Sequence, residues 1–225
     1  MNGKYAIQGI IGCLLFGVGD WLLGYVDPGE VTGDVFYFIS IGHGAGYPDW
    51  KIMLTMVCAI VGVLFLWQGF VHISDLMKEE KDRAEAARVF TFLTYSWLII
   101  HFVVTIMVFI YSYTFRTIGS KQAVIITNGL DKVMDPCILI AYFILVIAMI
   151  DLIIMIVKGK TKLERSDAFM TPLTWMILIG AVSLIIPTSP FSKGLYTFCM
   201  NAGMIIWFIR LLVFQKLEKE NEDIQ

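Results

Sequence analysis

The sequence lacks the short motifs that mark common catalytic and cofactor sites. It contains no H-E-x-x-H or C-x-x-C pair, no G-x-S-x-G and no G-x-x-x-x-G-K-[ST]. A zinc peptidase, a serine hydrolase and a P-loop ATPase therefore have no motif here. No lysine lies in the middle of an apolar stretch, which excludes an ordinary retinal Schiff-base protein. We expect no cofactor. We also expect no metal site, because the histidines fall at three different depths: His43, His72 and His101.

Cysteine is scarce, and none lies in a predicted loop. The chain has 4 cysteines, and all of them fall in apolar stretches: Cys13, Cys58, Cys137 and Cys199. They do not form a disulfide framework of the kind that staples small secreted domains. We interpret them as small buried hydrophobic residues. The chain also has no N-x-S/T sequon, so no N-glycosylation site indicates which side of the membrane a loop faces.

Apolar residues dominate what is present. They make up 58% of the 225 residues, and the mean hydropathy is +0.76, whereas soluble domains have about 45–50% apolar residues. The net charge of −2 gives no indication of nucleic-acid binding. The lengths of the apolar stretches, and the charged residues that flank them, predict an all-α integral membrane protein. We expect a single six-transmembrane helix bundle embedded in a lipid bilayer. The predicted spans are residues 5–26, 51–73, 89–114, 133–157, 170–187 and 194–214.

The basic residues predict the orientation of this bundle. Twelve lysines and arginines fall on the side that holds residues 1–4, and five fall on the other. The positive-inside rule then places both termini in the cytoplasm, most simply at the cell membrane. The stretch 5–26 is too long for a typical signal-peptide core, and no small-x-small cleavage site follows it, so we expect it to remain as a helix.

Three loops differ in kind. Residues 27–50 contain an apolar run, VFYFISI, that is too short to span and fits either a re-entrant lid or an interfacial loop. Residues 75–88 lack Pro and Gly, and we expect them to continue the second and third helices as a solvated hairpin. Residues 158–169 form a basic loop that fits either anionic headgroups or simple topology.

Asp20 is the most informative polar residue, because it interrupts the apolar stretch 5–26. An ionisable side chain at such depth usually faces protein or a water-filled cavity. Asp20 shares a face of about 80° with Gly9, Cys13, Gly17 and Gly24, given 100° per residue in a helix. Small residues let helix backbones approach closely, so we predict that Asp20 lies on a packing face.

A polar stripe on the third span is a plausible neighbour for Asp20. His101 and Thr105 lie on one narrow helix face with Thr94, Trp97, Val108 and Ser112. These side chains fit a hydrated pocket, but the hydroxyls equally fit bonds to carbonyls four residues earlier. Asn201 of the last span is close to Asp20 in depth. Candidate binding residues in this outer and middle group are Asp20, His101, Thr105 and Asn201.

A second polar group is predicted nearer the cytoplasm. Gln68 and His72 share a helix face with Asp75. Asp151 and Arg210 lie at nearly the same depth, so an ion pair between them is one interpretation. In the other, Arg210 extends to the headgroups and Asp151 is neutral. The inner candidates are Gln68, His72, Asp151 and Arg210.

Three functions fit these residues. The first is a small carrier or channel-like transporter of a solute or ion, with protonatable groups at both depths. The second is an intramembrane enzyme or receptor that binds a lipid-like or other small molecule beside Asp20 and His101. The third is a scaffold or accessory subunit whose polar residues only join helices.

Overall fold

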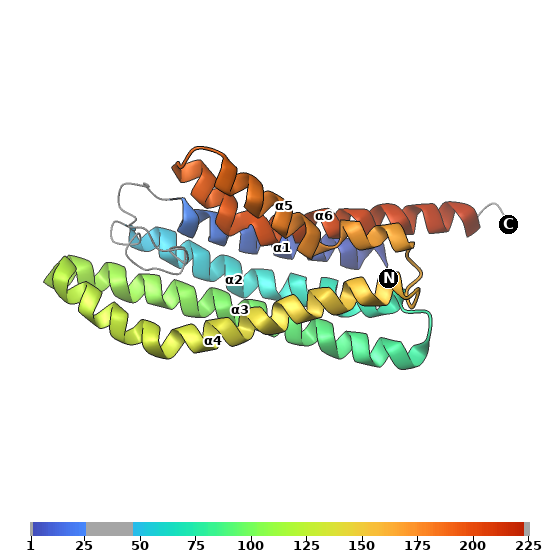
Figure 1. Cartoon of the computed structure of the whole chain (residues 1–225), viewed down its shortest axis with the longest axis horizontal. Helices are drawn as coiled ribbons and strands as arrows, with labels where there is room; N and C mark the ends of the chain where they lie inside the picture. Colours follow the sequence, from blue (N-terminus) through green and yellow to red (C-terminus); the bar gives the residue numbers. More distant parts are fainter. Residues whose placement is uncertain (1, 26–46, 223–225) are drawn as a thin grey trace.

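A computed structural model describes residues 2–25 and 47–222 of the chain. Apart from one isolated bridge, the regular structure in this part is helical, and it forms an elongated bundle (Figure 1). The elements in order are α1 (Gly3–Gly24), α2 (Asp49–Val71), η3 (His72–Leu76), α3 (Glu80–Ile118), α4 (Ser120–Val157), η4 (Arg165–Met170), α5 (Pro172–Ile185) and α6 (Pro190–Glu222). The lid or interfacial loop predicted for 27–50 lies, up to residue 46, outside the described residues.

Five of these helices are long and apolar enough to cross a membrane, as in a helical integral membrane protein. They are α1, α2 with η3, α3, the Pro136–Val157 part of α4, and α6. The predicted span 170–187 contains α5, which has only 14 residues, or about 21 Å of helix at 1.5 Å per residue. Pro172 begins α5, a position where the missing N–H costs nothing.

Helix α1 lies between α2 and α6, and its glycines permit that position. A Cβ added to Gly12 would lie 2.6 Å from the backbone nitrogen of Leu66 on α2. Cβ atoms on Gly9 and Gly17 would overlap the rings of Phe208 and Phe198 on α6. The small residues of α1 therefore form packing faces toward two helices, as the sequence predicted for the Asp20 face.

Helices α3 and α4 form a long antiparallel pair on one side of the bundle, and α5 and α6 form a pair on the other (Figure 1). Gly119 joins α3 directly to α4 with a φ of 88°, a conformation that favours glycine. Contacts between α4 and α5 are sparse, so the two pairs meet along a seam. The buried core is apolar and includes Phe16, Leu66, Trp207 and Phe208.

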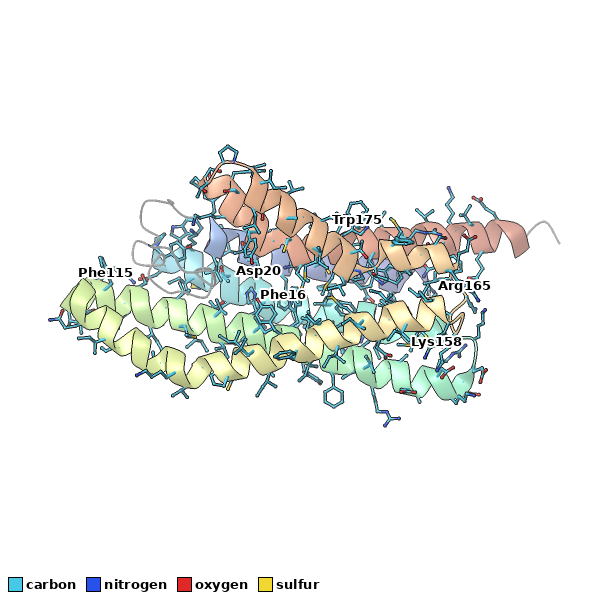
Figure 2. All side chains as sticks on the ribbon, in the orientation of Figure 1. Phe16, Asp20, Phe115, Lys158, Arg165 and Trp175 are labelled. Carbon is cyan, nitrogen blue, oxygen red and sulfur yellow. The ribbon has the colours of Figure 1, made fainter. Side chains whose placement is uncertain are left out.

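The start of α1 and the end of α6 lie at the same end of the bundle, here called the terminal end (Figure 1). Lys158 and Arg165 also lie there, whereas Asp20 and Phe16 lie inside the bundle (Figure 2). The helical hairpin predicted for 75–88 is only partly correct. Residues from Glu80 onward do extend α3, but α2 ends at Val71.

A backbone pairing between two loops follows η3 and keeps the helical backbone from continuing beyond Leu76. Met77 forms an antiparallel bridge with Thr161. The Lys78 amide donates to the Lys160 carbonyl at 2.9 Å, and the Lys162 amide donates to the Leu76 carbonyl at 2.8 Å. These bonds use backbone groups that a continued helix would have bonded internally. The basic loop 158–164 is therefore held against the α2–α3 connection.

Candidate binding cavity

Three helices bring Asp20, His101 and Asn201 into one hydrogen-bonded group. The Nδ1 of His101 on α3 lies 3.0 Å from Oδ1 of Asp20 on α1. The Nδ2 of Asn201 on α6 donates to Oδ2 of Asp20 at 2.6 Å. His101 and Asn201 are buried, and the Asp20 side chain is 21% exposed. The structure thus joins three of the four residues proposed for the outer and middle group.

Neighbouring groups hold this arrangement in place. Thr197 donates from its hydroxyl to the backbone oxygen of Asp20 at 2.8 Å, a second link between α1 and α6. Gly19 leaves room for the imidazole, because a Cβ there would lie 3.0 Å from Cε1 of His101. Phe16 meets the His101 ring edge to face at a centroid distance of 5.0 Å. The orientation of His101 is therefore set by α1 on two sides.

Thr105, the fourth candidate, does not join the group. Its hydroxyl is buried and donates to the His101 carbonyl at 2.7 Å. Thr94 bonds in the same way to the Phe90 carbonyl at 2.9 Å. For these two threonines the structure supports bonding within the helix rather than a hydrated stripe. Ser112 instead reaches the Tyr47 carbonyl at 3.2 Å.

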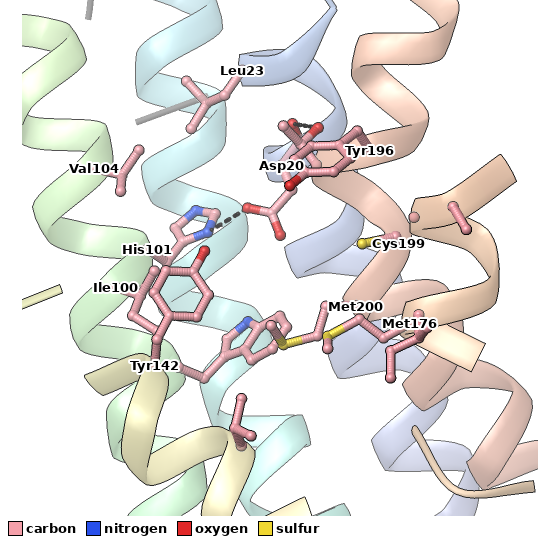
Figure 3. A pocket seen from close by; sticks show the side chains of 16 residues that line it. Asp20, Leu23, Ile100, His101, Val104, Tyr142, Met176, Tyr196, Cys199 and Met200 are labelled. Atoms are coloured by element: carbon pink, nitrogen blue, oxygen red, sulfur yellow. Dashed lines mark hydrogen bonds and ion pairs between the residues drawn. The ribbon is translucent and has the colours of Figure 1, made fainter. Parts of the chain in front are cut away.

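A cavity of about 330 Å³ lies beside Asp20 and His101 (Figure 3). Its walls come from α1, α3, α4, α5 and α6, and most of the lining side chains are apolar. Tyr142 of α4 and Tyr196 of α6 lie on opposite sides of the Asp20 carboxylate (Figure 3). Asp20 and His101 therefore form the polar end of an otherwise largely apolar space.

The cavity lies at the seam between the two helix pairs. Trp97 and Val104 of α3 and Val146 of α4 face Met176 of α5 across it. Ile177 also lines the cavity, although 59% of its surface is exposed. One wall residue on α5 therefore also belongs to the outer surface of the bundle.

Two buried polar atoms near this site have no hydrogen-bond partner among the described residues: Nε2 of His101 and Oδ1 of Asn201. Both residues contact Asp20 through their other polar atom, His101 through Nδ1 and Asn201 through Nδ2. Buried polar groups are normally hydrogen-bonded, so these two atoms are exceptions within an otherwise bonded group.

The inner candidates do not form one cluster. Arg210 donates from Nε to Oδ1 of Asp167 at 2.7 Å, so the predicted Asp151–Arg210 pair is wrong. Asp167 lies in η4, where it also accepts from the Glu164 amide and completes a capping box. The capping-box pattern of Glu164 and Asp167 was the sequence signal that could have pointed to Asp167. Asp151 is half-buried on α4 and makes no hydrogen bond to the described residues.

His72 and Gln68 lie at the end of α2 and the start of η3, and neither bonds to Arg210 or Asp167 in the described structure. His72 follows the last residue of α2 and begins η3, and its Nδ1 lies 3.0 Å from Oδ2 of Asp75. Its ring stacks on Tyr5 at a centroid distance of 3.5 Å. Gln68 is half-buried in the preceding turn. In residues 2–25 and 47–222, no three potential ligands are placed to hold a metal ion.

Comparison with known proteins places the chain in a family. The model of the Family of unknown function (DUF6796) matches residues 1–218, so the chain belongs to that family. No curated protein and no solved structure matches it. The family description assigns no activity, and the functional argument therefore rests on the cavity.

Proposed function

We propose that this family member binds a small amphiphilic molecule within the membrane. The observation that carries the proposal is the Asp20–His101–Asn201 group at one end of a largely apolar cavity. Binding sites for small molecules combine apolar walls with a few well-placed polar groups. The apolar part of the ligand would lie against α4 and α5, and its polar group would reach Asp20.

The size of the cavity limits the ligand. A volume of about 330 Å³ lies at the lower end of the range of about 300–1,000 Å³ that small-molecule pockets have. A molecule with on the order of ten non-hydrogen atoms fits this volume, whereas a complete phospholipid does not. The α4–α5 seam supports entry from the hydrocarbon side, because an apolar molecule is already concentrated there.

Binding fits the geometry better than transport does. A carrier for a polar solute needs suitable groups along the whole route, but the buried core that includes Phe16, Leu66 and Phe208 is apolar. Arg210 and His72 are each engaged with a carboxylate of their own. Transport remains a hypothesis that would require a second conformation. Its test is ligand-dependent flux in proteoliposomes and the loss of that flux in Asp20→Asn.

Binding also fits better than acid–base catalysis. A catalytic imidazole held by a carboxylate at Nδ1 acts through Nε2. Here Nε2 of His101 is buried, and a Cβ on Gly19 would lie 3.2 Å from it. The carboxylate of Asp20 is the group exposed toward the cavity. The site is therefore arranged to hold a ligand rather than to transfer its protons. A purely structural role predicts no ligand at all.

The membrane arrangement that we propose has six crossings, with both termini on the cytoplasmic side of the cell membrane. The start of α1 and the end of α6 lie at one end of the bundle (Figure 1). Twelve of the 17 lysines and arginines fall in the segments that the sequence assigns to the side of residues 1–4, as the positive-inside rule requires of the cytoplasmic side. Helix α5 is shorter than a bilayer core of about 30 Å, so its crossing requires local thinning of the bilayer.

The binding proposal is tested with purified protein in a zwitterionic detergent and phenylbutanol, a neutral probe with eleven non-hydrogen atoms. Wild type should bind it by calorimetry and gain thermal stability. Gly180→Leu should abolish binding, because Gly180 lines the cavity and a Cβ there meets only Cys199 Sγ at 3.8 Å.

Gly129→Leu is the matched control. A Cβ at Gly129 has nothing within 4 Å, and Gly129 does not line the cavity. This variant should bind phenylbutanol as wild type does. Binding that is equal in Gly180→Leu and wild type would show that the probe occupies another place, and the proposal would fail.

A further inference from the structure

We infer that the ligand of this cavity is an organic cation, a lipophilic amine, with its charged nitrogen at Asp20. The inference rests on the proposed binding function and deepens it by naming the ligand class. Asp20 and His101 are the only acidic or basic side chains among the residues that line the cavity in the described part of the chain. The net charge of the cavity lining therefore depends on these two side chains.

Asp20 supplies the one carboxyl group of the described cavity lining, which contains no lysine or arginine. Asp20 accepts from the imidazole of His101 and from the amide of Asn201, and it has no lysine or arginine partner in the described structure. The Asp20 side chain is half-buried, and ionisable groups within a membrane are normally paired. A ligand cation would supply the missing charge.

Aromatic side chains around the carboxylate strengthen this inference. Trp97, Tyr142 and Tyr196 all line the cavity. Tyr142 directs its hydroxyl toward the His101–Asp20 pair, and Tyr196 lies on the other side of Asp20 (Figure 3). Aromatic faces attract cations through the ring quadrupole, most strongly where the site is desolvated. A carboxylate flanked by aromatic rings is suited to an ammonium group.

The rest of the cavity fits the apolar part of such an amine. Met176 and Met200 line it together with Ile177, Ala181 and Val146. Methionine side chains are flexible and polarizable, so they adapt to apolar groups of different shape. The absence of lysine and arginine from the described lining disfavours carboxylates and phosphates, which Asp20 would repel.

The test compares three ligands of nearly equal size on the unaltered full chain in zwitterionic detergent: phenylbutylamine, phenylbutanol and phenylbutanoate. Calorimetry at neutral pH measures each affinity. We expect the amine to bind at least about tenfold more tightly than the alcohol, because its hydrogen bond to Asp20 is charge-assisted. The carboxylate should not bind measurably. Gly180→Leu should abolish the binding of both the amine and the alcohol.

The variant Asp20→Asn keeps the shape of the side chain and removes its charge. It should reduce amine affinity to that of the alcohol while alcohol binding persists. Tyr142→Leu should weaken the amine more than the alcohol, and it provides a second test if Asp20→Asn does not fold.

Equal affinities of amine and alcohol, or tighter binding of the carboxylate, would overturn the cation inference and leave the proposed binding function standing. If none of the three ligands binds wild type, both proposals fail. Amine binding that persists in Gly180→Leu would place the amine outside the cavity and would also overturn the inference.

Discussion

The imidazole of His101 and the carboxylate of Asp20 are 3.0 Å apart, although they belong to helices on two sides of the bundle. Helices α3 and α6 have little direct contact with each other. Asp20 bonds both, through His101 on α3 and Asn201 on α6. This carboxylate therefore joins the two helix pairs and also forms the polar end of the cavity between them.

Removal of the Asp20 carboxylate should destabilise the bundle. Asp20→Ala leaves two buried donors, on His101 and Asn201, without an acceptor. Each unsatisfied group costs about 1–3 kcal/mol, so we expect a loss of about 2–4 kcal/mol in the free energy of unfolding. Equilibrium unfolding in mixed micelles measures it.

The matched control for this loss is Asp49→Ala. Asp49 pairs with Arg116 at 2.6 Å, but its side chain is 71% exposed, so the change should be below about 1 kcal/mol. Equal losses in the two variants would mean that the Asp20 hydrogen bonds contribute no more than an exposed pair.

A methyl group at Gly12 should disrupt the contact between α1 and α2. In Gly12→Ala the new Cβ would meet the backbone nitrogen and Cα of Leu66 at 2.6 and 2.8 Å, and backbone atoms cannot move aside as a side chain can. We expect a lower yield of folded protein and a lower unfolding temperature. Size-exclusion profiles and thermal unfolding report both.

Gly129→Ala serves as the control for Gly12→Ala. Its Cβ has nothing within 4 Å, and alanine is the better helix former by about 1 kcal/mol. This variant should be neutral or slightly stabilising. Normal folding of Gly12→Ala would contradict the close approach of α1 to α2.

The partner of Arg210 can be identified with a double-mutant cycle. Arg210→Met should strand the Asp167 carboxylate, which is 3% exposed, and cost about 2–3 kcal/mol, the lower end for a buried pair because the arginine is 23% exposed. Asp167→Asn should couple with Arg210→Met, whereas Asp151→Asn should be additive with it. Coupling with Asp151 instead would contradict the structure.

The loop pairing at the terminal end should show an alkaline pH dependence. The Lys160 ammonium donates to Oδ1 of Asp82 at 2.9 Å, and this hydrogen bond, together with the charge of Asp82, raises the pKa of Lys160 above its ordinary value of 10.5. A raised pKa in the folded state means that the stabilisation is complete below that ordinary value and is lost as the pH rises through the folded pKa. Thermal unfolding of wild type and Lys160→Met should therefore converge at alkaline pH. A constant difference would contradict an ionic contribution.

Much of the fold was accessible from the sequence because membrane helices are local features. The apolar stretches around α1, α2, α3, α4 and α6 are each long enough to cross a bilayer on their own, and their lengths do not depend on their neighbours. The packing face of α1 was also predictable, since the spacing of its glycines and Asp20 follows from helix geometry alone. Residues near helix ends were less predictable. The connection after η3 forms a bridge from Met77 to Thr161, which lies far along the chain.

The sequence predicted several residues of the candidate site, but it did not predict how they are arranged around a cavity. An intramembrane Asp20 and His101 are costly unless partnered, so each was expected from the sequence to need a partner at its own depth. The identity of the partners follows from helix packing: His101 and Asn201 for Asp20, and Asp167 rather than Asp151 for Arg210. Depth is a property of one helix, whereas the neighbour across an interface depends on how several helices pack. The positions of Tyr142 and Tyr196 beside Asp20, and the cavity itself, follow from that packing and have no counterpart in the pattern of any single helix.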